Sequence, residues 1–399
     1  MTRTIVLLGI GHTNAFIVRQ WMEHPVADCR LVCVSLFPTA TYSGMLPGTL
    51  AGQFTDDQMR IDLAALASRA GAELIRAHAN GLDLESGHLL FSDHDPVSFD
   101  VLSIGVGSKP LGVARHRGSN VLVPIKPMQT FLTRLDARID QATGSKPAET
   151  QQAIRLLVVG GGVAGVEIAM CLRAHLDQAW PDRRFKIIIH HAGERIAGGL
   201  RDRSVRLIES VLQQRQVNVL CRSEVTEVTD HGVVTSDGCE HPADAVIWAT
   251  GAAPPEVLST FPLEKDDRGF LATTPTLQSK TDRRIFAVGD CGTIVATPSP
   301  KAGVYAVRQA PILWHNLRAV LNGDALKRYR PQSDYLKLIN TGERKAVMEY
   351  GWLSMHAGWC WRLKTWIDRR FIQEYQFDSQ AQTAPLHNVA TVKPQTEDR

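Results

Sequence analysis

The chain has 399 residues, of which 44% are hydrophobic and 21% are charged, and its formal net charge is +3. This composition is typical of a folded globular protein with enough apolar material for two or three domains. The 44 basic and 41 acidic residues are nearly balanced, which gives no reason to expect a nucleic-acid partner.

The first predicted elements are a strand, a tight turn, a helix and a second strand. Residues 4–8 are apolar and lead into Gly9-Ile-Gly11, residues 13–22 have helical periodicity, and residues 31–36 have the pattern of a strand. A helix N-terminus after such a turn is the preferred protein site for the pyrophosphate of a dinucleotide. Asn14 stands where the third glycine is expected, which loosens the match without abolishing the phosphate site.

The same pattern begins again near residue 154 and is more complete. Gly160-x-Gly162-x-x-Gly165 has every glycine between a strand and a helix. Similar late strands follow both units at 99–107 and 243–251, so the two units form an internal repeat. We therefore predict an α/β protein with two Rossmann-like dinucleotide-binding domains and a small C-terminal α+β region.

Neither unit has the acidic residue that usually binds the adenosine ribose at the end of the second strand. Ser35 occupies this region in the first unit, and His190-His191, followed by Glu194 and Arg195, occupies it in the second. A missing carboxylate removes the repulsion against a 2′-phosphate. The sequence is compatible with either NADH or NADPH as the cofactor of the second unit, and it slightly favours NADPH.

Residues 283–292 (RRIFAVGDCG) resemble the flavin-ribitol motif of the pyridine-nucleotide-disulfide oxidoreductase superfamily, in which the aspartate, here Asp290, accepts a hydrogen bond from the ribitol. Residues 42–48 (YSGMLPG) and 300–309 (PKAGVYAVRQ) are also similar to type II NADH dehydrogenases and to the FAD module found fused to selenide, water dikinase. The resemblance spans residues 5 to about 371. It implies FAD in the first unit and NAD(P)H in the second.

The resemblance and the two turns give four segments and two sets of site residues. We expect a discontinuous FAD domain at 1–120 and 275–325, an NAD(P)H domain at 121–274, a C-terminal interface region at 326–377 and a flexible tail at 378–399. The candidates for FAD are Gly9, Gly11, His12, Thr13, Asn14, Ser35, Met45, Leu46, Pro47, Gly107, Lys109, Gly289, Asp290, Lys301, Ala302, Gly303 and Val304. The candidates for NAD(P)H are Gly160, Gly162, Val163, Ala164, Gly165, Glu167, His190, Arg195, Thr250 and Gly251.

These features predict a FAD-dependent NAD(P)H:acceptor oxidoreductase. The hydride passes from the nicotinamide to flavin N5 and then to a quinone or another small acceptor, and the protein supplies geometry and electrostatics. Tyr42 and Lys301 are the candidates for the catalytic environment of the flavin, because a cation near flavin N1 and C2=O would stabilise the reduced anionic flavin. A plain surface lysine is the alternative for Lys301.

The acceptor is not defined by the sequence. No cysteine occurs at 42–47, where disulfide reductases carry a cysteine pair, so a thiol relay is excluded there. Gln309 stands alone where type II NADH dehydrogenases carry paired glutamines beside the quinone. The alternatives are a flavin-dependent oxygenase or oxidase, and a slow-turnover redox-sensing protein that binds FAD and NAD(P)H.

The seven cysteines form no C-x-x-C pair and no zinc-ligand spacing, so we expect neither a disulfide scaffold nor a metal site. No apolar run has the length of a membrane span, and no signal-peptide layout precedes the first strand, which favours a cytoplasmic protein.

Residues 359–371 (WCWRLKTWIDRRF) combine tryptophans with basic residues. Trp359, Leu363, Trp366 and Ile367 share one face at helical spacing, and such a composition is typical of a segment at a membrane surface. The stripe is short and contains Asp368, so we favour packing on the flavin domain or on a dimer partner. Contact with the inner face of the membrane is the alternative, and the resemblance places a homodimer interface after Tyr335.

Overall fold

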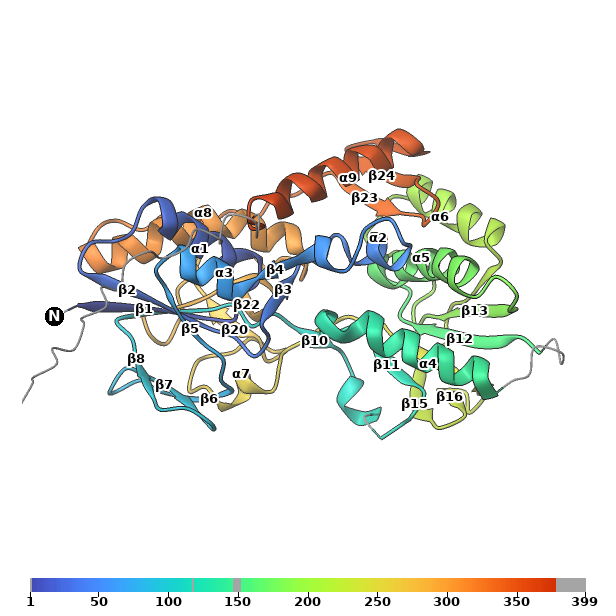
Figure 1. Ribbon diagram of the computed structural model, residues 1–399, viewed down its shortest axis with the longest axis horizontal. Helices are drawn as coiled ribbons and strands as arrows, with labels where there is room; N and C mark the ends of the chain where they lie inside the picture. The colour runs from blue at the N-terminus through green and yellow to red at the C-terminus, as the bar shows by residue number, and fades with distance from the viewer. Residues whose placement is uncertain (1, 117, 146–151, 378–399) are drawn as a thin grey trace, which may run out of the picture.

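The computed structural model describes residues 2–116, 118–145 and 152–377 (Figure 1). The tail expected at 378–399 lies outside these residues. Two parallel five-stranded sheets lie side by side along the longest axis of the molecule, and a C-terminal helix crosses above both (Figure 1). The predicted α/β fold class with two Rossmann-like units is confirmed.

The first sheet has the strand order β21-β9-β1-β2-β5, and every neighbouring pair is parallel. Its strands are β1 (Arg3–Leu8), β2 (Cys29–Val34), β5 (Glu73–Ile75), β9 (Val101–Ile104) and β21 (Ile285–Ala287). Strand β1 is almost wholly buried because both faces of a parallel sheet are covered. One face packs against α1 (His12–Glu23), α3 (Leu63–Arg69) and α8 (Gly303–Asn322).

The other face of this sheet is covered by a small antiparallel meander and a short helix. These are β6 (Ala79–Asp83), β7 (His88–Phe91), β8 (Val97–Ser98) and α7 (Val257–Thr260). Further short elements lie near this sheet, namely β3 (Thr39–Thr41), β4 (Arg60–Asp62), β20 (Leu271–Thr273) and β22 (Gly292–Ile294). Helix α2 (Leu46–Leu50) reaches over to the second half and packs against α5 (Val163–Ala179) (Figure 1). The chain returns to the first sheet only at β21, after completing the second.

The second sheet repeats this design with the order β11-β18-β12-β13-β14, again fully parallel. Its strands are β11 (Leu122–Pro124), β12 (Ile154–Val159), β13 (Phe185–His190), β14 (Val217–Leu220) and β18 (Ala245–Trp248). Three helices pack on one face, namely α4 (Phe131–Ser145), α5 (Val163–Ala179) and α6 (Asp202–Gln214). The meander β15 (Val225–Thr229), β16 (Gly232–Thr235) and β17 (Glu240–Pro242) packs on the other.

Two connections tie the halves together. Strands β10 (Lys109–Pro110) and β19 (Ala252–Ala253) pair antiparallel where the chain leaves the first sheet and where it comes back. At the C-terminus, β23 (Lys337–Asn340), β24 (Ala346–Tyr350) and β25 (Leu353–Ala357) form an antiparallel sheet that leads into α9 (Gly358–Gln373). Helix α9 runs from the second half towards the first (Figure 1).

Candidate functional site

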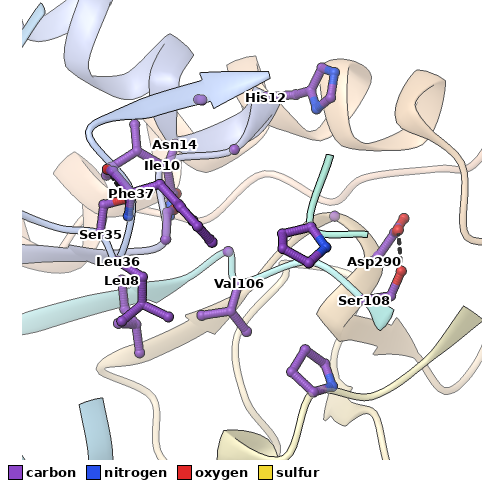
Figure 2. A pocket seen from close by; sticks show the side chains of 18 of the residues that line it. Leu8, Ile10, His12, Asn14, Ser35, Leu36, Phe37, Val106, Ser108 and Asp290 are labelled. Atoms are coloured by element: carbon purple, nitrogen blue, oxygen red, sulfur yellow. Dashed lines mark hydrogen bonds between the residues drawn. The ribbon is translucent and has the colours of Figure 1, made fainter. Parts of the chain in front are cut away.

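A cavity of about 470 Å³ lies at the carboxyl ends of the strands of the first sheet. Figure 2 shows Ser35 and Phe37 at one end of this cavity and Asp290 with Ser108 at the other. Ten of the seventeen FAD candidates line it, namely Gly9, Gly11, His12, Thr13, Asn14, Ser35, Gly107, Gly289, Asp290 and Gly303. The other seven are not among its lining residues, namely Met45, Leu46, Pro47, Lys109, Lys301, Ala302 and Val304.

The turn between β1 and α1 opens the amino end of α1 to this cavity. Gly9 has φ +80°, and a Cβ there would lie 2.8 Å from the carbonyl oxygen of Gly105, so only glycine fits. Gly11 is the N-cap of α1, and no side chain caps the helix there. The first N–H groups of α1 are therefore available to a phosphate.

Asn14, which departs from the glycine motif, closes the first turn with hydrogen bonds. Its side chain is fully buried, and its Nδ2 donates to the carbonyl oxygen of Gly9 at 2.8 Å. Ser103 Oγ on β9 donates to Asn14 Oδ1 at 2.7 Å. The asparagine thus replaces the third glycine with hydrogen bonds that join the turn to the neighbouring strand.

Three polar side chains meet at the Asp290 end of the cavity. Ser108 Oγ donates to Asp290 Oδ2 at 2.7 Å (Figure 2), and Lys126 Nζ donates to Ser108 Oγ at 2.7 Å and to Asp290 Oδ2 at 3.3 Å. Gln309 Oε1 accepts from the Gly289 N–H at 2.7 Å and so holds the loop before Asp290. Lys126 and Ser108 were missed in the sequence, although Lys126 is the only lysine in the proline-rich connection at 119–127.

Lys301, which we expected beside the flavin, faces β22 instead. Its Nζ donates to the carbonyl oxygen of Gly292 at 2.6 Å and to Thr293 Oγ1 at 2.8 Å, and it lies 4.2 Å from the ring centroid of Phe270. Burial lowers the pKa of Lys301. The cation that lines the cavity close to Asp290 is Lys126.

An aromatic cluster forms the wall beside His12. Tyr42 does not line the cavity, and its ring stacks on Phe371 of α9 with 4.4 Å between centroids. The His12 ring lies 5.4 Å from Tyr42 and 5.8 Å from Phe371. Burial lowers the pKa of His12 to about 4, so the imidazole at the cavity wall is neutral at pH 7.

Buried charges lie behind this wall. Lys364 Nζ of α9 pairs with Asp368 Oδ2 at 3.1 Å and donates to the carbonyl oxygen of Gly44 at 2.9 Å. Tyr42 Oη donates to Asp368 Oδ1 at 3.1 Å. Burial raises the pKa of Asp368 and of Glu167 on α5. Burial alone would lower the pKa of Lys364, but the charges of these two carboxyls outweigh it, so the pKa of Lys364 is raised.

Glu167, a candidate for the nicotinamide side, faces the C-terminal sheet. Its Oε1 accepts from the Asn340 N–H of β23 at 2.7 Å. The other two candidates near the domain crossing are also engaged. Thr250 Oγ1 donates to the carbonyl oxygen of Leu111 at 2.7 Å, and the carbonyl oxygen of Gly251 accepts from the Leu111 N–H at 2.6 Å.

The second glycine-rich turn has the close packing that its sequence demands. A Cβ on Gly165 would lie 1.9 Å from the carbonyl oxygen of Gly160, and Gly160 itself has φ +117°. Gly162 is the N-cap of α5, and no side chain caps this helix. The first N–H groups of α5, beginning with Val163 and Ala164, are again available to a phosphate.

The last residue of β13, His190, and the residue that follows it, His191, point to different environments. His190 is fully buried, its Nδ1 lies 2.8 Å from Ser223 Oγ, and its ring centroid is 4.6 Å from that of His241 in β17. The adjacent His191 Nδ1 instead accepts from the Gly161 N–H at 3.3 Å. The side chain at the turn is therefore that of His191 and not that of His190, because neighbouring side chains of a strand point to opposite faces.

Helix α9 exposes two of its three tryptophans to solvent, whereas Trp361 is half-buried and its Nε1 donates to Gln53 Oε1 at 2.8 Å. We were therefore wrong to favour packing of the stripe that contains Trp359 and Trp366 on the flavin domain. Trp359 and Trp366 are 47% and 57% exposed, as is Trp352 in the β24–β25 turn at 81%. The face packed on the protein carries Cys360, Lys364, Asp368 and Ile372. Within the described ranges, no helix is long and apolar enough to cross a membrane, and no three acidic, histidine or cysteine side chains are grouped to hold a metal ion.

Comparison with known proteins agrees with this geometry. Residues 5–310 match the family model of pyridine nucleotide-disulphide oxidoreductases. The NADH dehydrogenase-like protein YutJ of Bacillus subtilis is 25% identical over 349 residues, which cover 86% of this chain and 91% of that protein. The demethylphylloquinone reductase NdbB of a Synechocystis strain is 25% identical over 298 residues, 69% of each chain.

The same fold occurs in a solved structure. The sulfide:quinone oxidoreductase of Aquifex aeolicus superimposes with a TM-score of 0.75 at 17% identity, covering 94% of this chain and 91% of that one. Binding of FAD and NAD(P)H is characteristic of the family. The chain therefore belongs to the pyridine nucleotide-disulphide oxidoreductase family and is a FAD- and NAD(P)H-binding oxidoreductase.

Proposed function

We propose that this protein is a FAD-dependent NAD(P)H:acceptor oxidoreductase that reduces a quinone or another small acceptor without a redox-active disulfide. The observation that carries the proposal is the first cavity, which joins the open amino end of α1 to the Asp290 loop. When bound, FAD supplies the hydride chemistry, with N5 accepting from the nicotinamide and the acceptor reoxidising the flavin. The protein supplies binding, orientation and charge.

We assign the cavity residues to the parts of FAD in order. The amino end of α1 at Gly11 would hold the pyrophosphate, and Asp290, positioned by Ser108, would accept from the ribitol. Lys126 brings a positive charge to the same end, where it would stabilise negative charge on the reduced ring system. We therefore assign to Lys126 the role that the sequence suggested for Lys301.

The cysteine nearest to this end does not support a thiol mechanism. Cys291 Sγ donates to the carbonyl oxygens of Ile104 and Val288, both at 3.1 Å. Burial raises the pKa of the Cys291 thiol to about 11, so it is protonated at neutral pH. A protonated thiol is not a nucleophile, and residues 42–47 contain no cysteine that could act in its place.

A quinone is the acceptor class that the relatives favour, since NdbB is named as a demethylphylloquinone reductase and the Aquifex protein as a sulfide:quinone oxidoreductase. Rapid mixing without oxygen tests the proposal. The holoprotein should lose its flavin absorbance on mixing with NADPH or NADH and regain it when a soluble quinone such as menadione is added. Reoxidation by oxygen alone, with menadione inert, would indicate an oxidase instead.

We also propose that the exposed face of α9 contacts a lipid surface. Trp359 and Trp366 lie on it, with the exposed Arg362, Arg369 and Arg370 nearby. Tryptophan prefers the interface between headgroups and acyl chains, and arginine is attracted to anionic headgroups. A quinone dissolved in the membrane would then be close to the protein that reduces it. The alternative is that a second copy of the chain covers the same face, and the vesicle experiment in the Discussion distinguishes the two.

A further inference from the structure

The carboxyl end of β13 lies beside the second glycine-rich turn, because the Gly160 N–H donates to the carbonyl oxygen of His190 at 2.9 Å. In dinucleotide-binding domains the adenosine ribose lies at this strand end, and a carboxylate there binds the 2′-hydroxyl of NADH. The residue that follows β13 is His191, and the first carboxylate after it is that of Glu194. The strand end thus lacks the negative charge that would repel a 2′-phosphate.

His191 is fixed against the turn by both of its ring nitrogens. Its Nδ1 accepts from the Gly161 N–H at 3.3 Å, and its Nε2 donates to the carbonyl oxygen of Arg195 at 3.0 Å. A Cβ on Gly161 would lie 2.7 Å from Cγ of His191, so the ring lies directly on the turn. An imidazole whose N–H is donated to the Arg195 carbonyl oxygen therefore stands beside the turn, and it places no negative charge where an NADH site has its carboxylate.

Arg222 borders the same loop from the segment that follows β14. Its N–H donates to the carbonyl oxygen of Gly193 at 2.9 Å, and the Ser223 N–H donates to that of His191 at 2.9 Å, so the two segments run side by side. The Arg222 guanidinium pairs with Glu194 at 2.8 Å, and the two side chains are 74% and 79% exposed. An ion pair so open to solvent contributes little, so the guanidinium is free to exchange Glu194 for a phosphate.

Arg195 is the second guanidinium of the loop. It pairs with Asp202 at the start of α6, and the two side chains are 44% and 72% exposed. A guanidinium suits phosphate because its N–H groups match two phosphate oxygens at once, and such charge-assisted bonds are stronger than neutral ones. The loop therefore offers His191 and two arginines against two carboxylates that both lie in exposed pairs.

We propose that the second dinucleotide site prefers NADPH to NADH, with His191 as the residue that determines this preference and Arg195 and Arg222 as partners of the 2′-phosphate. The inference rests on the proposed function, since it deepens the assignment of this turn to NAD(P)H. One charge-assisted contact to the extra phosphate is enough for a preference of about tenfold or more in kcat/KM.

The test compares two fragments that need no flavin chemistry. Adenosine 2′,5′-bisphosphate and adenosine 5′-monophosphate are titrated separately into the FAD-loaded protein by calorimetry. We expect the bisphosphate to bind about tenfold more tightly or better, and His191→Glu to reverse the order. Equal affinities, or tighter binding of the monophosphate by the unaltered protein, would overturn the inference.

Two further variants keep the test decisive if His191→Glu folds poorly. Arg222→Ala should weaken binding of the bisphosphate and leave binding of the monophosphate unchanged, whereas equal effects on both fragments contradict the assignment. His231→Glu places the same charge on an exposed turn of the same half and should change neither affinity. A failure of flavin reduction by both nicotinamides would count against the proposed function, but it would leave the fragment affinities readable.

Discussion

Lys126 Nζ lies 3.3 Å from Asp290 Oδ2, and Ser108 Oγ bridges the two side chains at 2.7 Å from each. The lysine comes from the loop between β11 and α4 in the second half and the aspartate from the loop after β21 in the first, so both halves of the molecule build this end of the cavity. Lys126 therefore supplies the positive charge at the Asp290 end of the cavity.

Replacement of Lys126 by methionine should make flavin reduction harder. The loss of a cation near negative charge on the reduced ring should slow reduction by NAD(P)H about tenfold or more. The flavin midpoint potential should fall by roughly 30 mV for each tenfold loss in stability of the reduced form. Spectroelectrochemical titration measures this shift. Lys301→Met is the matched control and should leave the potential unchanged, because Lys301 bonds to Gly292 and Thr293 instead.

Asn14→Ala should destabilise the first half of the molecule. The substitution removes the donor to the Gly9 carbonyl and the acceptor of the Ser103 hydroxyl, and both groups are left in a buried environment. We expect a loss of about 2–4 kcal/mol in the free energy of unfolding, measured by urea denaturation. A double variant with Ser103→Ala should lose less than the sum of the two single losses. A loss under about 0.5 kcal/mol for Asn14→Ala would contradict this role.

Gly165→Ala should strongly slow NAD(P)H oxidation while FAD binding persists. The new Cβ would overlap the Gly160 carbonyl oxygen at 1.9 Å, so the turn and α5 must separate. We expect kcat/KM to fall by about a hundredfold or more, with the flavin spectrum retained. Gly198→Ala in the following loop is the control, because nothing lies within 4 Å of a Cβ there. Normal turnover by Gly165→Ala would show that this turn does not bind the nicotinamide nucleotide.

His12 should make stability fall in acid. Its pKa is about 4 in the folded protein and 6.5 in the unfolded chain, so the unfolded chain binds the proton more readily. The contribution of neutral His12 is fully present above pH 6.5 and is lost as the pH falls from 6.5 towards 4, by about 3 kcal/mol in total. Urea denaturation at pH 7.5 and pH 4.5 should show a smaller loss for His12→Phe than for the unaltered protein. An identical loss in both proteins would contradict the burial of a neutral ring.

The tryptophan face of α9 should decide association with lipid. Flotation with vesicles rich in phosphatidylglycerol should recover the protein, and the pair Trp359→Gln and Trp366→Gln should lower the bound fraction about tenfold. Neutral phosphatidylcholine vesicles should bind less because the arginines lose their partners. If no vesicle binds and light scattering shows a dimer that the same pair disrupts, the face is an interface between two copies.

The sequence predicted the features that are local. The turns at Gly9 and Gly160 could be recognised because strand, glycines and helix follow one another directly along the chain. The same holds for the Asp290 loop, whose motif resembles that of a known superfamily. The two-sheet fold follows from the repetition of these units, since each strand–turn–helix–strand unit builds a parallel sheet.

The features that were mispredicted depend on contacts between distant segments. Lys126 reaches Asp290 across 164 positions, and no local pattern marks it. Lys301 was assigned from its place in a motif, but it lies before α8 and its Nζ bonds to Gly292 and Thr293 of β22. The exposure of Trp359 and Trp366 was missed because the buried face of α9 includes the Lys364–Asp368 ion pair, and hydrophobic periodicity alone selects the wrong face.

The most direct test of the central claim is stopped-flow absorbance of the FAD-loaded protein mixed with NADPH or NADH under argon. The account predicts that the flavin band bleaches within seconds with at least one nicotinamide and that menadione restores it. A flavin band that persists with both nicotinamides would contradict the claim that this protein passes a hydride from NAD(P)H to FAD.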